Sequence, residues 1–271
     1  MASLPLLPQV FSILAGLVED RAGLHYRADD LELLRDKVSP RAEMLGFDSL
    51  LDYYYFLRYD PQGAAEQEAL IEALVVHETY FYREADQLEA YVGQLLPRAL
   101  GEGGTARIWC AAAATGEEPL TLAMMLADRG LLGRVQIVAS DISDRALQRA
   151  RRGEFSGRSL RALPKELGKW FDRRGEAVVV DRKLVDCIDW RRLNLIDRPA
   201  VEALGHFSAV LCRNVLIYFS DQTARTVVAS LTASLEPRGF LLVGASESLM
   251  RYGTSLSCDE CGGAFFYRRV A

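Results

Sequence analysis

The chain has 271 residues, of which half are hydrophobic and a quarter are charged, and its formal net charge is −5. This composition is typical of a globular protein and excludes a disordered or fibrous chain. No apolar run reaches the ~18 residues of a membrane span, so we expect no membrane insertion, and the odd number of cysteines indicates reduced thiols in a cytoplasm.

The first part of the chain predicts helices. Val10, Leu14 and Leu17 recur at helical spacing, as do Leu70 and Leu74. We therefore predict an all-helical domain over residues 1–96, whose last helix covers about 84–96. This segment carries seven Lys and Arg against seventeen Asp and Glu, a net charge of −10, whereas residues 97–271 have a net charge of +5. The asymmetry favours two domains, and the lack of a concentrated basic face argues against a nucleic-acid partner.

Residues 97–271 have the pattern of an α/β domain. Apolar segments typical of buried strands are followed by amphipathic segments typical of helices. This alternation predicts a doubly wound parallel sheet that is covered by helices on both faces. The strands are expected at residues 107–112, 135–140, 207–212 and 240–243, with an antiparallel edge strand at 264–267.

Residues 153–192 interrupt this alternation and predict a small β insertion. Residues 178–181 and 184–188 have the pattern of a hairpin that turns at Arg182 and Lys183. Residues 151–192 carry twelve Lys and Arg against seven Asp and Glu, a net charge of +5. Two interpretations stay open, which are a solvated excursion between sheet strands and a small docking subdomain with a basic surface.

The loop after the first strand predicts a ligand site, because ligands bind at the carboxyl ends of parallel strands. Ala112 and Gly116 allow the backbone to approach a ligand closely. Glu117 and Glu118 would repel a pyrophosphate and would suit a cationic ligand such as S-adenosylmethionine, although acidic residues also favour any helix N-terminus. Asp141 ends the second strand, where it can bind ribose hydroxyls or cap the next helix. Together these residues favour a cofactor that contains a nucleoside.

Five motifs in a fixed order carry a family resemblance: His77–Glu84, Cys110–Pro119, Ser140–Ile142, Asn194–Leu195 and Cys212–Phe219. Together they closely resemble the bacterial chemotaxis receptor glutamate O-methyltransferases of the CheR type. The resemblance covers the chain from about residue 70 to its C-terminus.

The resemblance implies a class I S-adenosylmethionine-dependent methyltransferase, with a Rossmann-like sheet, a helical N-terminal domain and a small β-hairpin insertion. It implies transfer of a methyl group from S-adenosylmethionine to glutamate carboxylates of the cytoplasmic region of a chemoreceptor, which yields S-adenosylhomocysteine. We accordingly expect a cytoplasmic monomer that acts in chemotactic signal transduction. The acidic N-terminal domain departs from the family pattern, in which helices that meet acidic receptors tend to be basic.

The resemblance also implies roles for individual residues. Arg83 and Tyr218 would be catalytic and would face the methyl group and the incoming carboxylate, although Tyr218 also fits a core aromatic position. The expected cofactor contacts are Thr79, Arg83, Ala112, Glu118, Asp141, Asn194, Leu195, Asn214 and Val215. We expect no metal, because Cys258 and Cys261 form a single pair, whereas structural zinc needs four ligands.

A glutamate side chain has a reference pKa of about 4.3 and is ionised at neutral pH, so methyl transfer to it needs no general base. Two alternatives stay open. One is a methyltransferase for nitrogen or small-molecule acceptors, which would use Asn214 and Tyr218 as its acceptor site. The other is a non-catalytic signalling module that senses S-adenosylmethionine.

Overall fold

The computed structural model describes residues 4–163 and 165–270. By its internal contacts the chain divides into two compact units. The helical unit contains the residues up to Val76 together with Tyr218–Thr223, and the α/β unit contains His77–Ile217 and the residues from Ala224 onward. These units are groups of residues in contact, whereas the boundary expected after residue 96 separates two domains. That boundary stays a prediction.

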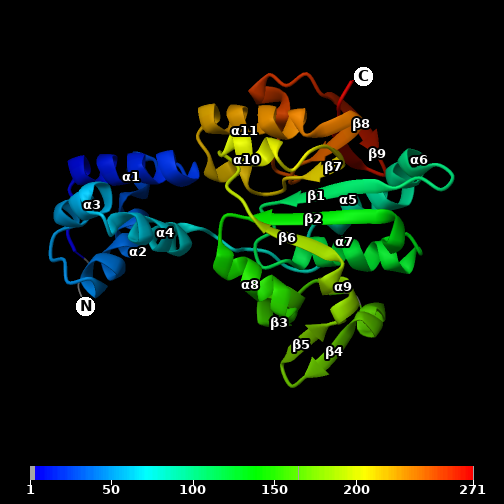
Figure 1. Cartoon of the computed structure of the whole chain (residues 1–271), viewed down its shortest axis with the longest axis horizontal. Helices are drawn as coiled ribbons and strands as arrows, with labels where there is room; N and C mark the ends of the chain where they lie inside the picture. Colours follow the sequence, from blue (N-terminus) through cyan, green and yellow to red (C-terminus); the bar gives the residue numbers. More distant parts are fainter. Residues whose placement is uncertain (1–3, 164, 271) are drawn as a thin grey trace. The chain divides into compact units, whose positions relative to one another are not determined.

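Four α-helices form the helical unit: α1 (Pro8–Ala22), α2 (Leu31–Met44), α3 (Leu50–Tyr59) and α4 (Gly63–Leu74), with the short 3-10 helix η1 (Ala28–Asp30) before α2 (Figure 1). Their apolar faces bury one residue about every turn, as the helical spacing predicts. The buried side chains include Leu14, Val18, Leu34, Val38, Tyr53, Leu57, Leu70 and Leu74. An ion pair between Arg41 and Glu66 lies beside this core. Glu66 accepts hydrogen bonds from the Arg41 guanidinium and from the Tyr53 hydroxyl, each at 2.6 Å.

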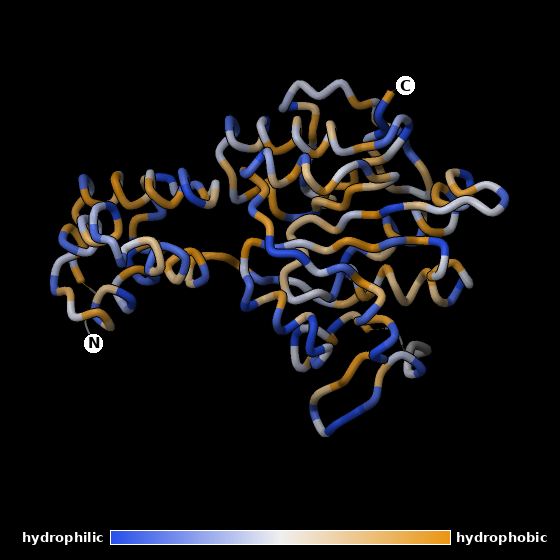
Figure 2. Tube along the Cα trace, viewed as in Figure 1, coloured by the Kyte–Doolittle hydropathy of each residue, from blue (hydrophilic) through white to orange (hydrophobic). Residues whose placement is uncertain are grey.

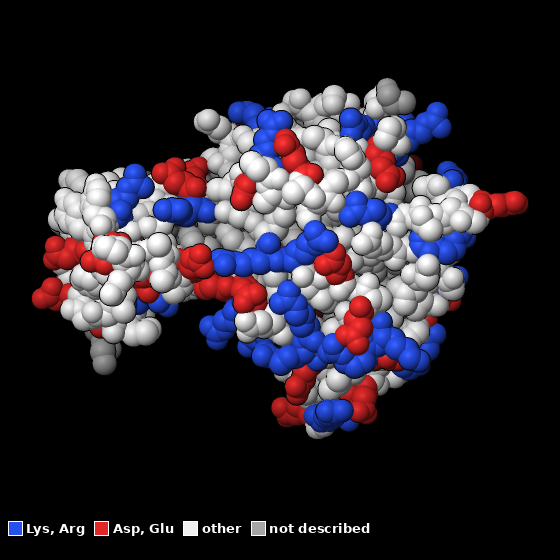
Figure 3. Space-filling model, viewed as in Figure 1, with Lys and Arg blue, Asp and Glu red and all other residues white. Residues whose placement is uncertain are grey.

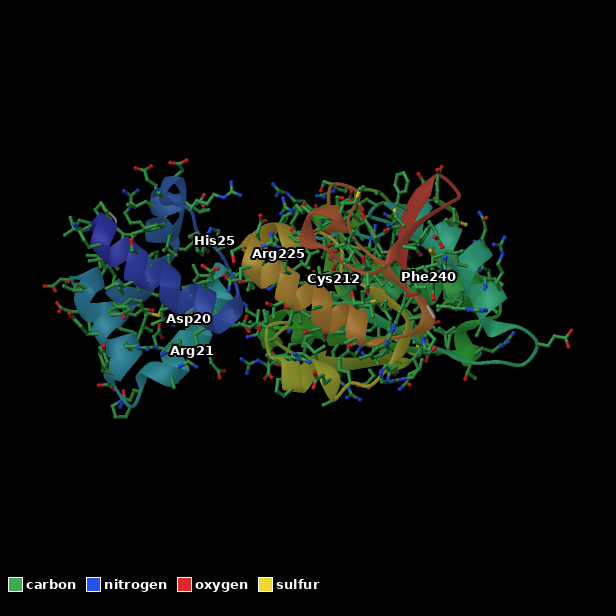
Figure 4. The ribbon with its side chains drawn as sticks, turned by 90° about the horizontal axis from the view of Figure 1, so that it is seen from above. Asp20, Arg21, His25, Cys212, Arg225 and Phe240 are labelled. Carbon is green, nitrogen blue, oxygen red and sulfur yellow. The ribbon has the colours of Figure 1, made fainter. Side chains whose placement is uncertain are left out.

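A segment from late in the sequence completes the helical unit. The His25 amide donates a hydrogen bond of 2.8 Å to the Tyr218 carbonyl, and Leu24 and Phe219 form an isolated antiparallel bridge. Figure 4 labels His25, which lies in the segment that follows α1. Tyr218 therefore belongs by its contacts to the helical unit.

The α/β unit is built on a seven-stranded sheet with the strand order β6-β2-β1-β7-β8-β10-β9. The strands are β1 (Ala106–Ala111), β2 (Val135–Asp141), β6 (Ile188–Arg192), β7 (Phe207–Leu211), β8 (Leu235–Leu242), β9 (Ser257–Cys261) and β10 (Ala264–Arg268). The first five are parallel, and β10 is antiparallel to both β8 and β9. The expected antiparallel strand at 264–267 is thus present, but β9 and not this strand forms the edge.

Helices cover both faces of this sheet, as the alternating pattern predicted. In Figure 1, α11 (Asp221–Ala233) lies on one side of the central strands, and α7 (Glu117–Asp128) and α8 (Asp144–Arg152) lie on the other. Figure 2 shows the central strands as mainly hydrophobic, and Ile108, Ile137 and Val210 are fully buried within them. The helical run expected over 84–96 extends further, from α5 (Ala85–Ala90) through the π-helix η2 (Tyr91–Leu95) to α6 (Leu96–Leu100).

The insertion is a three-stranded antiparallel sheet with the order β3-β5-β4. Its strands are β3 (Glu154–Ser156), β4 (Phe171–Arg174) and β5 (Ala177–Val180). The prediction of a hairpin turning at residues 182–183 was wrong, because β5 pairs with β4 around Gly175, which has a φ of 64°. Asp181 ends the strand pattern: its carboxylate accepts a hydrogen bond of 2.9 Å from the Lys183 amide and caps α9 (Arg182–Asp186).

Basic side chains gather on the α/β unit over α8, α9 and β6 (Figure 3). The exposed members are Arg145, Arg149, Arg151, Arg152, Arg182, Lys183, Arg191 and Arg192. Several of them contact nearby acids, for example Arg182 with Asp186 and Arg191 with Asp189. Within the described ranges, no helix is both long enough and apolar enough to cross a membrane.

Candidate functional site

The candidate site lies where β1, β2, β7 and β8 end. The loop after β1 is held in an unusual conformation, because Ala112 and Ala114 have positive φ angles of 58° and 47°. Such angles cost about 1–3 kcal/mol for a residue other than glycine, and they concentrate at ligand sites. Gly116, with a φ of 96°, has no room for a side chain, since an added Cβ would lie 2.6 Å from that of Ala150. Glycine at position 116 therefore lets the start of α7 pack closely against Ala150 of α8, and the approach of a ligand to this loop stays a prediction.

Asp141 fixes this loop from the end of β2. One carboxylate oxygen accepts a hydrogen bond of 2.8 Å from the Ala114 amide, and the other accepts one of 2.9 Å from the Ser143 amide. Asp141 is 7 % exposed. The Leu193 amide donates to the Asp141 carbonyl at 2.9 Å, which brings the predicted pair Asn194–Leu195 to the same end of the sheet.

The two glutamates that open α7 have different surroundings. Glu117 is 1 % exposed and accepts hydrogen bonds from the hydroxyls of Ser159 at 2.6 Å and Thr115 at 2.7 Å. Burial raises the pKa of Glu117, and these two hydroxyls lower it only in part. Glu118 forms an ion pair of 2.7 Å with Arg213 instead. The residue pattern alone treated the two carboxylates as alike, because it could not see the partners that separate them, and only the family resemblance singled out Glu118.

We expect a Glu117→Gln variant to gain stability relative to the wild type as the pH rises. The folded-state pKa of Glu117 lies above its ordinary value of 4.5, so the folded protein binds a proton that the unfolded protein releases. Wild-type stability therefore falls as the pH rises through this interval, whereas glutamine does not titrate. Denaturant unfolding of both proteins at several pH values between ~5 and ~8 measures the difference.

The same change at the exposed Glu102 provides the matched control. A stability difference between wild type and Glu117→Gln that stays constant with pH, or that moves the other way, would contradict the assigned direction of the pKa shift.

Arg213 joins three segments of the site. Its side chain is only 2 % exposed, and one guanidinium nitrogen donates to Glu118 at 2.7 Å. The other nitrogen donates to the Arg83 carbonyl at 2.7 Å and lies 3.2 Å from a Glu84 carboxylate oxygen. Burial raises the pKa of Glu118, and Arg213 opposes this shift. The guanidinium thus fixes the segment before α5 against the start of α7 and the end of β7.

A second set of hydrogen bonds positions Asn214, which has a positive φ of 59°. Its amide donates to Glu247 at 2.7 Å, and its side-chain nitrogen donates to Glu84 at 3.1 Å. Glu247 also accepts from the Gly244 amide at 2.7 Å, and Glu84 accepts from the Ala245 amide at 2.9 Å. Burial would raise the pKa of Glu84, but the Ala245 amide, Arg213 and Asn214 together lower it. A Cβ at Gly244 would lie 2.3 Å from the Asn214 side chain, so this approach requires glycine.

The structure brings most of the predicted site residues together within the α/β unit. Ala112 follows β1, Glu118 lies in the first turn of α7, Asp141 ends β2, and Asn214 and Val215 follow β7. The Arg83 side chain donates a hydrogen bond of 2.8 Å to the Glu78 carbonyl, within the segment that contains Thr79. Tyr218 belongs to the helical unit, so its part in the site stays a prediction.

Sequence reasoning missed Arg213, Glu84 and Glu247. All three lie in or beside short segments between regular elements, where no periodicity marks a buried side chain. One signal was present: Arg213 follows the mostly apolar run 207–212, beside which a charge needs a partner. Within the described residues, no group of three or more His, Cys, Asp and Glu side chains could hold a metal ion.

Comparisons with known proteins identify both parts of the chain. Residues 77–261 match the family model for the CheR methyltransferase SAM-binding domain, and residues 9–75 match the model for the CheR methyltransferase all-alpha domain. Chemotaxis protein methyltransferase 2 of Vibrio cholerae is 34% identical over 85% of this chain and 82% of its own length. Chemotaxis protein methyltransferase 1 of Pseudomonas aeruginosa is 31% identical over 95% of this chain and 97% of its own. The Escherichia coli chemotaxis protein methyltransferase is 32% identical over 88% and 84%, respectively.

Proposed function

The chain belongs to the CheR methyltransferase family, and from this membership we propose that it transfers a methyl group from S-adenosylmethionine to glutamate side chains of a chemoreceptor. The observation that carries the proposal is the full-length match, which includes both the helical and the SAM-binding parts of the family. Relatives named as chemotaxis protein methyltransferases favour this reaction over the two alternatives, a nitrogen or small-molecule acceptor and a module that senses the cofactor without turnover.

The donor groups at the strand ends fit S-adenosylmethionine. Asp141, at the end of β2, would accept charge-assisted hydrogen bonds from the ribose hydroxyls. Glu118 would accept from the cofactor's ammonium group, because Arg213 engages only one of its two oxygens among the described contacts. The remaining contacts would come from Thr79 and Arg83 at the amino-acid part, Ala112 in the loop, Asn194 and Leu195 beside the adenine, and Asn214 and Val215 beneath the methionine part.

When bound, S-adenosylmethionine supplies a methyl group on a positively charged sulfur. The substrate carboxylate would form the new oxygen–carbon bond as the sulfur–carbon bond breaks, which leaves a methyl ester and neutral S-adenosylhomocysteine, with no proton to move. The protein therefore has to position the carboxylate and exclude water, and such orientation supplies up to ~7–11 kcal/mol in favourable cases. Arg83 would orient the carboxylate by charge, and Tyr218 would close the pocket and donate a hydrogen bond.

We also propose a partner, a cellular location, an oligomeric state and domain boundaries for this protein. The partner would be the cytoplasmic region of a chemoreceptor or of a related signalling protein, and this partner makes the cytoplasm the proposed location. We propose that the protein acts as a monomer, because one chain carries the complete set of expected site residues. We also propose a helical domain over residues 1–96 and a methyltransferase domain over 97–271 that includes the insertion at 153–192.

The test is incubation of the protein with methyl-labelled S-adenosylmethionine and receptor cytoplasmic fragments, followed by alkali. A glutamate methyl ester releases labelled methanol, whereas a methylated nitrogen keeps its label. Release of methanol from a receptor fragment is the expected result. Label that resists alkali would support a nitrogen acceptor, and tight binding of the cofactor without any transfer would support a sensing module.

We expect Asp141→Asn to weaken the binding of S-adenosylhomocysteine by about 1–1.5 kcal/mol, roughly tenfold, because charge-assisted hydrogen bonds to the ribose are lost. Calorimetry of the wild type and the variant measures the change. Asp144→Asn, at the first residue of helix α8, is the matched control, and it should bind like the wild type. Equal affinities for wild type and Asp141→Asn would restrict Asp141 to holding the Ala114 and Ser143 amides.

A further inference from the structure

A cluster of arginines surrounds Tyr80, next to the proposed catalytic residue. The Arg161 guanidinium lies 3.8 Å from the centre of the Tyr80 ring, and that of Arg83 lies 5.9 Å from it. Both arginines also contact Glu78: Arg83 donates to its carbonyl and Arg161 to its carboxylate, each at 2.8 Å. Arg161 is therefore close to Arg83 through two shared neighbours, although it comes from the insertion.

The insertion is fixed in this position by buried contacts. Its turn η4 (Gly157–Leu160) accepts a hydrogen bond of 3.0 Å at the Ser159 carbonyl from the Phe81 amide, and the Ser159 hydroxyl donates to Glu117 at 2.6 Å. The Phe81 ring is fully buried and lies 4.8 Å from Phe155 and 5.2 Å from Phe171. Because Ser159 is anchored, Arg158 and Arg161 on either side of it are held beside the segment that carries Arg83.

This cluster has an excess of positive charge. Arg83, Arg158 and Arg161 all act on one carboxylate, and together they lower the pKa of Glu78, with Arg161 as the largest cause. Arg158 is exposed, and within the described part of the chain no hydrogen bond or ion pair is found for its side chain. The ion pair between Arg161 and Glu78 is also open to solvent, with 41% and 46% of the two side chains exposed. Exposed ion pairs contribute little to stability, so a carboxylate from another molecule can replace that of Glu78.

We propose that Arg158 and Arg161 form a subsite for a second carboxylate of the substrate, an Asp or Glu side chain close to the glutamate that is methylated. Glu78 occupies Arg161 in the free protein, and the substrate carboxylate displaces it on binding. The subsite selects acidic segments, while Arg83 orients the reacting group. This inference rests on the proposed function, because it takes the substrate to be a protein glutamate.

The test uses a receptor cytoplasmic fragment that the wild type methylates, and a second fragment in which the acidic residues flanking the methylated glutamate are changed to the corresponding amides. We expect the wild type to show a KM about three- to fivefold higher for the neutralised fragment, with a similar kcat. Arg161→Ala should raise the KM for the acidic fragment by the same factor and should no longer distinguish the two fragments. Arg158→Ala should act in the same direction, and Glu78→Gln should lower the KM by freeing Arg161.

Arg173→Ala provides the matched control, since it removes an exposed arginine from β4 of the same insertion, and we expect its KM values to equal those of the wild type. Calorimetric affinity for S-adenosylhomocysteine should be the same in all variants. If Arg161→Ala raised the KM equally for both fragments, its role would be structural and the subsite would be refuted. Equal KM values of the wild type for both fragments would refute it as well. The absence of any methyl ester from the wild type would instead refute the proposed function.

Discussion

Replacing Arg213 with methionine is expected to lower the free energy of unfolding of the α/β unit by about 3–5 kcal/mol. The guanidinium is buried and is the ion-pair partner of both Glu118 and Glu84. Methionine keeps much of the volume but leaves two carboxylates without a counter-ion in a region of low polarity. All three tryptophans of the chain, at positions 109, 170 and 190, lie in the α/β unit, so denaturant unfolding followed by tryptophan fluorescence measures this unit directly.

Two further variants separate charge from geometry. Arg213→Lys keeps the charge, but an ammonium group lacks the planar fork with which the guanidinium contacts both carboxylates. We therefore expect its free energy of unfolding to lie between that of the wild type and that of Arg213→Met. Arg225→Met is the matched control on the exposed surface of α11, where Figure 4 labels Arg225, and it should change the free energy of unfolding by less than about 0.5 kcal/mol. Equal stabilities of Arg213→Met and Arg225→Met would contradict a stabilising role for the buried ion pairs.

Arg83→Ala is expected to reduce methyl-ester formation on the order of a hundredfold at saturating cofactor. A hydrogen bond to a charged group contributes about 1.5–3 kcal/mol, and each ~1.4 kcal/mol corresponds to a factor of ten in rate. Because the interaction orients the reacting carboxylate, kcat should fall more than the affinity for cofactor. Turnover with a receptor fragment and calorimetric binding of S-adenosylhomocysteine give the two quantities.

Tyr218→Phe should lower turnover by about tenfold, because it removes one hydroxyl and keeps the ring. Tyr59→Phe, at a tyrosine that is 71% exposed, is the matched control and should be fully active. Full activity of both Arg83→Ala and Tyr218→Phe would assign the acceptor carboxylate to other residues. A large loss of cofactor affinity in Arg83→Ala, with little change in kcat, would make Arg83 a binding residue for the cofactor.

The general fold could be predicted because its signals are local. The helical spacing of Leu14 and Leu70 and the apolar runs that became β1, β2 and β7 depend on neighbouring residues alone. The fold of the insertion was harder to predict, because its sequence carries conflicting signals for strand and helix. Residues 184–188 are apolar enough for a strand, but the Asp181 cap makes their first part a helix. Strand β4 has a mostly charged sequence, and it forms because β5 and the Phe81 ring provide its partners.

In the candidate site, too, features that depend on local sequence could be predicted, and features that depend on distant residues could not. Gly116 and Asp141 could be predicted, since their positions at strand ends follow from the order of elements. The pairing of Arg213 with Glu84 and Glu118 could not, because it joins residues that are 129 and 95 positions apart. Such a pairing depends on how three loops pack. The family resemblance supplied residue roles that neither spacing nor composition contains.

The antiparallel bridge between Leu24 and Phe219 affects how the protein matures on the ribosome. The helices up to Val76 emerge early in translation, but their unit contains Tyr218–Thr223, which is synthesised only after most of the α/β unit. The helices up to Val76 are therefore synthesised well before the segment that completes their unit. Until Tyr218 is made, the His25 amide lacks the carbonyl that accepts its hydrogen bond, and a nascent chain arrested before this point leaves the helical unit without Tyr218–Thr223.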